Sequence, residues 1–251
     1  MIKFKLLSNS ILLTILNCLV ALLIPSITYG AGWNINPLRI DLSNSRKTAV
    51  ITVTNNLDQP TTIQIQPISW SQVDGLDVYI STKDLLISPP IVTIAPKGAQ
   101  IIRVALRKSI DPVQELSYRI NLQEIQPSLS TNETSVQIGL RVGIPVFVQP
   151  QSGASSPKLS WKVTATADNL VKLDLRNEGK VHVKISDLQL FSIGNEQTLA
   201  NDSGSSYILA GQFHSWLLKP ENSIVITPGH LHLKAYTDAT TVDTVIVVDK
   251  P

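Results

Sequence analysis

Two arginines have the side-chain chemistry to hold a negatively charged partner. Arg39 follows Pro37-Leu38 at the start of the first expected strand, and Arg119 lies in the strand sequence SYRINL. A guanidinium is planar and permanently charged, and its fixed fork of donors can grip a carboxylate through two parallel hydrogen bonds. Both arginines can point toward the junction of two predicted domains, whereas Arg103 is expected only to solvate a sheet edge.

The histidines and the sequence motifs do not indicate catalysis. His230 and His232 share one face of an expected strand, but the segment HLH offers no carboxylate to complete a metal site, so we interpret both as exposed strand residues. The chain has no GxSxG, GxGxxG, Walker-type or HExxH motif. We therefore predict a protein that is not an enzyme and that uses neither a metal nor a cofactor.

An alternating apolar stretch is a second unusual feature of the chain. The sequence SVQIGLRVGIPVFVQP covers residues 135–150, and its alternate aliphatic residues would share one face of an extended strand. They are Val136, Ile138, Leu140, Val142, Ile144, Val146 and Val148. Pro145 lies on the other face and removes one backbone donor, which is tolerated at a sheet edge. The stretch therefore predicts a long apolar strand that can stand at an edge.

The first thirty residues predict export. A basic start (MIKFK) precedes an apolar run over residues 11–24, and small residues follow at Thr28-Tyr29-Gly30. This order is typical of a secretory signal peptide. The alternative is a membrane anchor, but the run is short for a span, which needs roughly 20 apolar residues. We predict cleavage near Gly30.

Composition limits the chemistry and the partners of the mature chain. The only cysteine, Cys18, lies inside the predicted signal peptide, so the mature protein has no thiol for a disulfide, a metal site or a nucleophile. Removing Lys3 and Lys5 leaves 19 of the 21 basic residues against 19 acidic residues. A balanced charge does not favour nucleic acid or an anionic membrane as a partner.

The rest of the chain alternates between apolar and polar residues with a period of two. Such alternation, interrupted by Asn-, Gly- and Pro-rich turns, is typical of short, half-buried strands, and no stretch shows a helical period over about twelve residues. We therefore predict an all-β protein. The expected strands are Ala49–Asn55, Thr61–Trp70, Gln100–Arg107, Ser117–Ile125, Trp161–Ala167, Leu170–Asn177, Lys180–Ser192, His214–Pro220 and Thr244–Asp249.

A polar, proline-flanked segment at residues 149–157 predicts a linker. It divides the chain into a signal peptide at 1–30, a first domain at 31–150 and a second domain at 151–251. Parts of about 120 and about 100 residues each suit one immunoglobulin-like sandwich. The predicted fold class is therefore all-β, with two immunoglobulin-like β-sandwich domains.

Several motifs together resemble the periplasmic pilus-assembly chaperones of the chaperone-usher pathway. They are the signal peptide, PLRIDL near the mature N-terminus, NLQEIQP at the end of one strand, the polar loop PSLSTNETS and the strand ending in VFVQP. IPVFV in that strand and YILAG at residues 207–211 are similar to the archaic branch of the family. The resemblance covers nearly all of residues 31–251.

The resemblance implies a shape, a location and partners. In this family two immunoglobulin-like domains meet in an L shape, and the periplasmic chaperone binds an incomplete pilus subunit and delivers it to an outer-membrane usher. A chaperone strand fills the groove where the subunit lacks its own last strand. The implied donor residues are Val136, Ile138, Leu140, Val142 and Ile144, beside a loop at 127–134 that orders when a subunit binds. Unloaded chaperone can self-associate through the same stripe.

The resemblance also assigns roles to the arginines. Conventional members anchor the C-terminal carboxylate of the subunit with a lysine of the long strand, and the matching position here is Pro145. Its partner arginine matches Arg39, whereas an arginine in the YRINL strand is similar to the archaic branch. We therefore expect the carboxylate anchor at Arg119 first and at Arg39 second. The arginine that links the two domains in conventional members falls near Gln149.

Alternatives remain open for the strand and for the function. An ordinary core strand explains part of the apolar stretch, because its second half can pack inside its own domain while its first half projects. The alternative function is an exported structural or adhesive subunit of a surface fibre, although such subunits usually form one domain per chain. A carbohydrate-active or metal-dependent enzyme needs clustered carboxylates, and the acids are scattered apart from Asp238 and Asp243.

Overall fold

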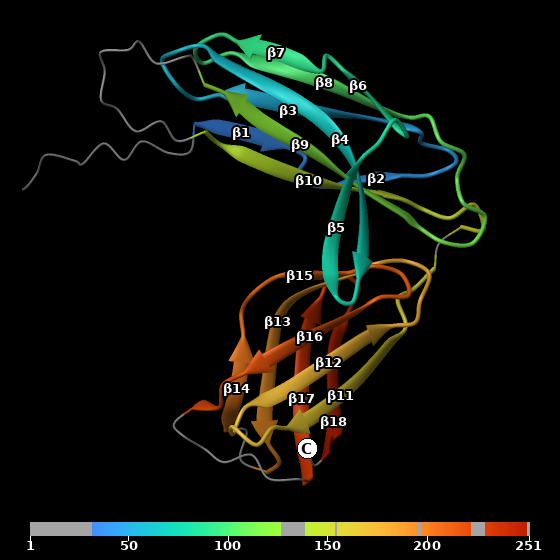
Figure 1. Ribbon diagram of the computed structural model, residues 1–251, viewed down its shortest axis with the longest axis vertical. Helices are drawn as coiled ribbons and strands as arrows, with labels where there is room; N and C mark the ends of the chain where they lie inside the picture. The colour runs from blue at the N-terminus through green and yellow to red at the C-terminus, as the bar shows by residue number, and fades with distance from the viewer. Residues whose placement is uncertain (1–31, 127–138, 154, 195–196, 222–228, 250–251) are drawn as a thin grey trace, which may run out of the picture. The chain divides into compact units, whose positions relative to one another are not determined.

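The computed structural model describes residues 32–126, 139–153, 155–194, 197–221 and 229–249. The predicted signal peptide, the loop at 127–134, Val136 and Ile138 lie outside the described residues. Where the chain is described, its regular structure consists almost entirely of strands (Figure 1). The described part holds no helix that is long and apolar enough to cross a membrane. The strands are β1 (Trp33–Asn36), β2 (Ile40–Leu42), β3 (Thr48–Asn55), β4 (Thr61–Val73), β5 (Leu76–Ser81), β6 (Leu85–Ser88), β7 (Ile91–Ile94), β8 (Ala99–Leu106), β9 (Leu116–Ile125), β10 (Arg141–Val148), β11 (Leu159–Ala165), β12 (Val171–Asn177), β13 (Val183–Ser192), β14 (Thr198–Asp202), β15 (Ser206–Ile208), β16 (Phe213–Leu218), β17 (Gly229–Thr237) and β18 (Thr241–Asp249).

The first ten strands form a sandwich of two sheets around one core. One sheet has the order β1-β3-β8-β6, and the other has the order β2-β10-β9-β4-β5 with β7 also paired to β4. Alternate residues of most of these strands point inward, as the period of two predicts, whereas β5 has no buried residue. Ile51 and Ile102 from the first sheet meet Ile65 and Ile120 from the second, and each is at most 2% exposed.

The strands after residue 158 form one eight-stranded sheet around a second core. Its order is β14-β13-β17-β18-β11-β12-β16, with β15 paired to β13. Leu190 of β13 and Leu173 of β12 lie in one buried cluster, although their strands are near opposite ends of the sheet. The sheet must therefore curl around this cluster. The prediction of an all-β chain with two β-sandwich cores is confirmed, while the domain boundaries at residues 30 and 150 stay predictions.

Several short strands were not expected from the sequence. The strands β1, β5, β6, β7, β14 and β15 have three to six residues each. Such short runs hold too few alternations to stand out, and pairing to longer neighbours defines them. For example, β1 is defined by its antiparallel pairing of Trp33–Asn36 with Thr52–Asn55.

One edge of β10 is open over part of its length. β9 pairs with β10 from Arg141 to Val148, whereas β2 covers the opposite edge only from Val146 onward. The Glu124 amide donates to the Leu140 carbonyl at 2.9 Å, and in an antiparallel ladder this direction alternates along the strand. The backbone groups of Arg141 and Gly143 therefore point away from β9, toward an edge that no described strand covers.

Candidate functional site

Arg119 lies on the outer face of β9, and its guanidinium has a hydrogen-bond donor without a partner among the described residues. Its neighbours Tyr118 and Ile120 enter the core, so the arginine side chain turns the other way and lies against the rings of Trp70 and Tyr79. The guanidinium carbon lies 4.2 Å from the Trp70 ring centroid and 5.2 Å from that of Tyr79. The side chain is 27% exposed, and its buried Nε has no hydrogen-bond partner among the described residues. Stacking therefore fixes the guanidinium while leaving donors for an incoming acceptor.

Asp77 on β5 organises the hairpin beside Arg119. Its carboxylate accepts hydrogen bonds from Trp70 Nε1 at 2.9 Å, from Gln72 Nε2 at 2.9 Å and from the Tyr79 hydroxyl at 2.6 Å. Burial raises the pKa of Asp77, but these bonds and the charge of Arg119 lower it more, so the net pKa lies below the usual range. The ionised carboxylate also lies 4.0 Å from Arg119 Nη2. Asp77 thus holds both rings that carry the guanidinium.

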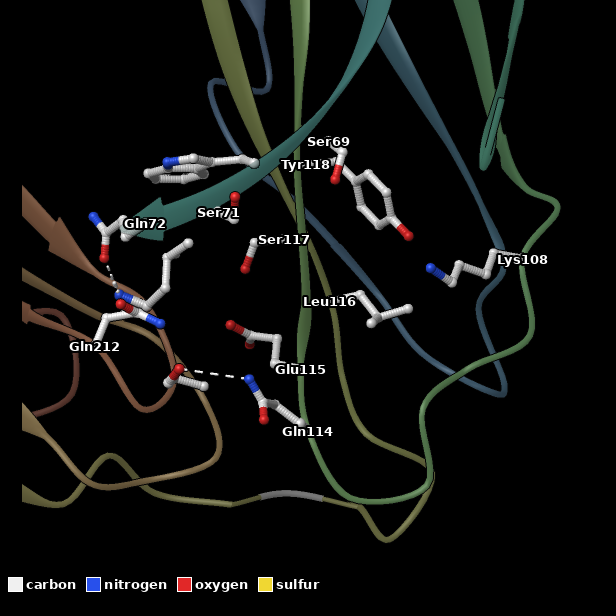
Figure 2. A pocket seen from close by; sticks show the side chains of 13 residues that line it. Ser69, Ser71, Gln72, Lys108, Gln114, Glu115, Leu116, Ser117, Tyr118 and Gln212 are labelled. Atoms are coloured by element: carbon white, nitrogen blue, oxygen red, sulfur yellow. Dashed lines mark hydrogen bonds between the residues drawn. The ribbon is translucent and has the colours of Figure 1, made fainter. Parts of the chain in front are cut away.

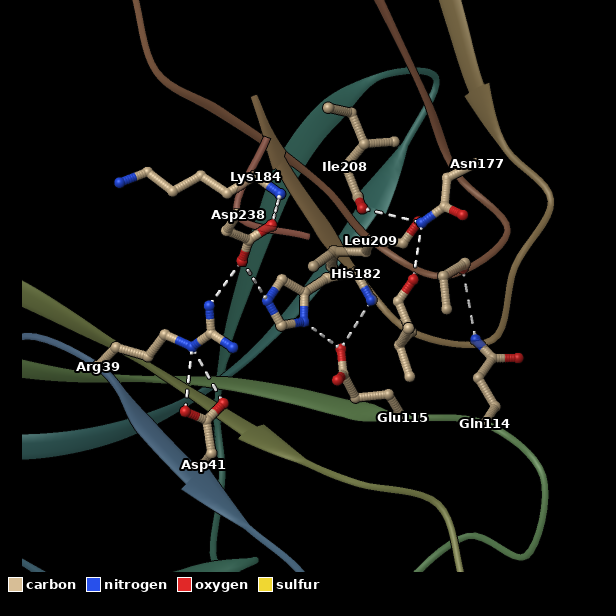
Figure 3. A network of polar contacts seen from close by, with 12 residues as sticks. Arg39, Asp41, Gln114, Glu115, Asn177, His182, Lys184, Ile208, Leu209 and Asp238 are labelled. Atoms are coloured by element: carbon tan, nitrogen blue, oxygen red, sulfur yellow. Dashed lines mark hydrogen bonds and ion pairs between the residues drawn. The ribbon is translucent and has the colours of Figure 1, made fainter. Parts of the chain in front are cut away.

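Arg39 has two carboxylate partners within the chain. Its Nε donates to Asp41 at 3.0 Å, and its Nη1 donates to Asp238 Oδ2 at 2.6 Å (Figure 3). Burial raises the pKa of Asp238, but the nearby His182 imidazole and hydrogen bonds from the Lys184 amide and Arg39 lower it to about 2. An incoming carboxylate would have to displace these partners. The Arg39 donors are thus occupied within the chain, whereas the Arg119 Nε has no hydrogen-bond partner among the described residues.

His182 and Glu115 form a buried pair that the sequence did not reveal. Glu115 Oε1 lies 2.7 Å from His182 Nδ1 and accepts the His182 amide at 3.0 Å, and the two side chains are 6% and 3% exposed (Figure 3). His182 Nε2 lies 3.5 Å from Asp238 Oδ2. The imidazole stacks on Phe147 of β10, with ring centroids 3.4 Å apart. The only sequence signal was a histidine inside the apolar run VHVKI.

We expect the free energy of unfolding to fall as the pH rises above the ordinary histidine value of about 6.5. Burial and the Arg39 charge lower the pKa of His182, but the Asp238 and Glu115 carboxylates raise it more, so the net pKa is raised. The stabilisation is therefore complete below the unfolded pKa and is lost as the pH rises through the folded pKa. Urea unfolding between about pH 6 and about pH 9 should show a slope of up to about 1.4 kcal/mol per pH unit.

Two variants separate this pair from other titrating groups. His182→Gln should flatten the pH dependence in that range, whereas His230→Gln, at an exposed position of β17, should leave it unchanged. A full slope in the His182→Gln protein would assign the pH dependence to another group.

Gln72 makes a further long-range link, from β4 to the segment around β15. Its Nε2 donates to the Tyr207 carbonyl at 2.8 Å, and its Oε1 accepts the Leu209 amide at 2.9 Å. Gln149, which lies near the position of the domain-linking arginine in the family that the sequence resembles, is exposed. Contacts of Gln72, Glu115 and Arg39 with residues beyond 180 supply such links instead.

A polar hollow of about 180 Å³ lies beside Gln72 and Glu115 (Figure 2). Serine and glutamine side chains make up much of its lining, including Ser69, Ser71 and Ser117. Lys108 and Glu115 are its charged lining residues. Glu115 is the one carboxylate among these lining residues, and it is paired with His182. The hollow therefore does not offer the pair of carboxylates that acid–base chemistry would use.

A family comparison identifies the first sandwich. Residues 32–154 match the family model of the pili and flagellar-assembly chaperone, PapD N-terminal domain. The first sandwich therefore belongs to this chaperone family. No curated protein matches the sequence.

Solved structures share the fold of this family member over most of its length. One is a chain of the CsuC-CsuE chaperone-tip adhesion subunit pre-assembly complex from archaic chaperone-usher Csu pili of Acinetobacter baumannii. It aligns with a TM-score of 0.63 and 18% sequence identity, and the alignment covers 88% of this chain and 100% of that chain. A chain of the Salmonella enterica SafA pilin–SafB chaperone complex aligns at 0.61 and 14% (87% and 98% covered). The E. coli chaperone DraB aligns at 0.57 and 18% (87% and 96% covered). These identities show a shared fold, and the archaic branch stays a prediction.

The predicted donor residues of this chaperone family member differ in their surroundings. Leu140 is 37% exposed just before β10, Val142 is half-buried, and Ile144 is 1% exposed inside the core. The side chain of Ile144 is therefore unavailable to a partner in this structure, because the facing sheet already covers it. This burial argues against a donor role for Ile144, whereas Leu140 and Val142 stay predicted donors, and Val136 and Ile138 lie outside the described residues.

The remaining candidate residues, His232, Asp238 and Asp243, contact other side chains of the chain and do not gather into one site. His232 Nε2 contacts Asp243 Oδ1 across β17 and β18, which explains a histidine that sequence reasoning treated as simply exposed. Asp238 joins the His182 network instead of pairing with Asp243. Across the described ranges, no three His, Cys, Asp or Glu residues gather closely enough to hold a metal ion.

Proposed function

We propose that this protein is a periplasmic chaperone that captures incomplete pilus subunits by donor-strand complementation and delivers them to an outer-membrane usher. The observation that carries the proposal is the open edge of β10 from Arg141 to Pro145, in a chain of the chaperone family. A subunit strand can add to this edge through backbone hydrogen bonds. Leu140 and Val142, preceded by Ile138 and Val136 in the sequence, supply the apolar side chains that fill the subunit groove.

Arg119 is the proposed anchor for the C-terminal carboxylate of the subunit. Its guanidinium is held against two rings and retains unsatisfied donors, while Pro145 directly opposite on β10 provides none. Arg39 is the second candidate, because Asp41 and Asp238 already occupy its donors. The fibre-subunit alternative is disfavoured, because two cores follow each other in one chain.

Co-expression in a bacterial periplasm tests the function. The full chain, tagged at its C-terminus, is produced together with a pilus subunit from the same organism, and the complex is measured by size exclusion with light scattering. We expect a one-to-one complex and soluble subunit. A subunit that aggregates equally with and without the chain would contradict the proposal.

Arg119→Ala should weaken subunit capture by about ten- to a hundredfold, because a charge-assisted bidentate pair contributes about 1.5–3 kcal/mol. Arg119→Lys should recover only part of the loss, since a lysine keeps the charge but not the fork. Arg103→Ala, at an exposed arginine of β8, is the matched control and should capture normally. Dissociation constants from competition with labelled subunit measure the series, and unchanged affinity of the Arg119 variants would move the anchor elsewhere.

A further inference from the structure

On the outer face of β10, the position beside Arg119 is a glycine, Gly143, and carries no side chain. The residues of β10 on this face are Arg141, Gly143, Pro145 and Phe147, because Ile144 and its alternate neighbours face the core. Gly143 lies within a regular strand and has no positive φ, so the backbone conformation does not require a glycine. A glycine within a strand often marks a close approach of a ligand or another backbone.

The missing side chain of Gly143 exposes the anchor. A Cβ at this position would lie 3.6 Å from Arg119 Nη1 and 3.2 Å from Asn121 Oδ1. A larger side chain would extend from that point over the guanidinium. Gly143 thus leaves the Nη1 side of the Arg119 guanidinium uncovered on the face opposite to the core.

Strand geometry requires a path across β10 to this guanidinium. A strand added to the open edge of β10 lies about 4.8 Å from it, and β9 lies about the same distance on the other side. A carboxylate at the end of the added strand must therefore cross over β10 to reach Arg119. Arg141 has a long side chain, and Pro145 and Phe147 are buried, so the crossing is open at the exposed Gly143.

We propose that Gly143 is the specificity-determining residue at which the chain end of a captured strand crosses β10, so that the site selects peptides ending in a free carboxylate at this register. The inference rests on the proposed function and extends it from an anchoring arginine to a path that bulk can close. Trp70, Tyr79 and Asp77 act as positioning residues, because they hold the guanidinium at the end of the path. Asn121 borders the path on β9.

The test compares two forms of one pilus subunit. One form has its native C-terminus, and the other carries two additional residues, Gly-Ser, which move the carboxylate beyond Arg119. For the wild-type chaperone we expect the extension to weaken binding by about ten- to a hundredfold, as loss of a charge-assisted pair does. For Gly143→Leu we expect the native form to bind as weakly as the extended form, so that the extension has little further effect.

Matched variants make the result specific. Gln123→Leu places the same side chain at an exposed position of the same sheet face, on β9, and should keep the wild-type difference between the two subunit forms. Gly143→Ala should reduce that difference only in part, and it decides the question if Gly143→Leu does not fold. Thermal unfolding of each variant checks the fold.

The outcomes separate this inference from the proposed function. Wild-type protein that binds neither subunit form contradicts the proposed function and the inference that rests on it. Wild-type binding together with a full extension effect in folded Gly143→Leu, or in Gly143→Ala if the leucine variant is unfolded, overturns the role of Gly143 and leaves the chaperone function intact.

Discussion

A protein with Ile138→Asp and Leu140→Asp is expected to fold normally and to lose subunit capture by at least about a hundredfold. Burial of one aliphatic side chain contributes about 1.5–3 kcal/mol, so removing two costs about 3–6 kcal/mol before the penalty of placing charges in an apolar groove. Leu140 is 37% exposed, so a charge there costs the free chaperone little. Ile138 lies outside the described residues and is placed beside Leu140 by sequence alternation alone. Competition binding with a labelled pilus subunit measures the loss.

The matched control carries the same two charges on another exposed face. Val50→Asp and Leu86→Asp replace side chains that are each 53% exposed on β3 and β6. This protein should capture the subunit as the wild type does. Retained capture by the Ile138/Leu140 variant, with its melting temperature unchanged, would remove the donor role from this stretch.

Asn177→Asp is expected to destabilise the second sandwich by about 3–5 kcal/mol, the cost of breaking a buried polar network. The fully buried Nδ2 donates to the carbonyls of Val181, Ile208 and Leu209 at 2.8, 3.2 and 3.3 Å. Oδ1 accepts the amide of Gly179 at 3.0 Å. An aspartate has the same shape but no donors, so it would place a carboxylate against three carbonyl oxygens.

Calorimetry measures the effect as a lower melting temperature of one transition. A loss of 3 kcal/mol or more corresponds to a shift of more than about 12 °C for a domain near 100 residues. Asn55 makes the same kind of contacts in the first sandwich, with Nδ2 donating to the carbonyls of Gln59, Ile94 and Ala95, so Asn55→Asp should shift the other transition. Asn34→Asp, at an exposed position, is the control. A shift below about 4 °C for Asn177→Asp would contradict the assignment.

The alternation of the sequence was sufficient to predict strands. At Ile51–Val53, Ile63–Ile65 and Ile102–Val104 every second side chain is buried, as the period of two requires. This information is local, because a strand with one buried face carries its own pattern in a few neighbouring residues. The second half of the apolar stretch followed the same rule, and Val146 and Val148 lie in the core.

Local pattern was not sufficient to rank the two arginines. Arg39 and Arg119 each precede an isoleucine in a predicted strand, so their local sequences do not distinguish them. Arg39 meets Asp238, which is 199 residues away in the chain, whereas Arg119 meets two rings and Asp77. Which arginine keeps free donors was therefore decided by contacts between distant segments.

The amino-acid sequence by itself determined the longer strands, the two β cores and the family resemblance, because side-chain alternation and short motifs depend on neighbouring residues. Only the tertiary structure decided where the core ends along the apolar stretch, since the facing sheet covers Ile144 and leaves Leu140 partly exposed. It also decided the pairing of Glu115 with His182, which are 67 residues apart. Such contacts arise when sheets and loops from distant parts of the chain are brought together, and no local spacing of residues encodes them.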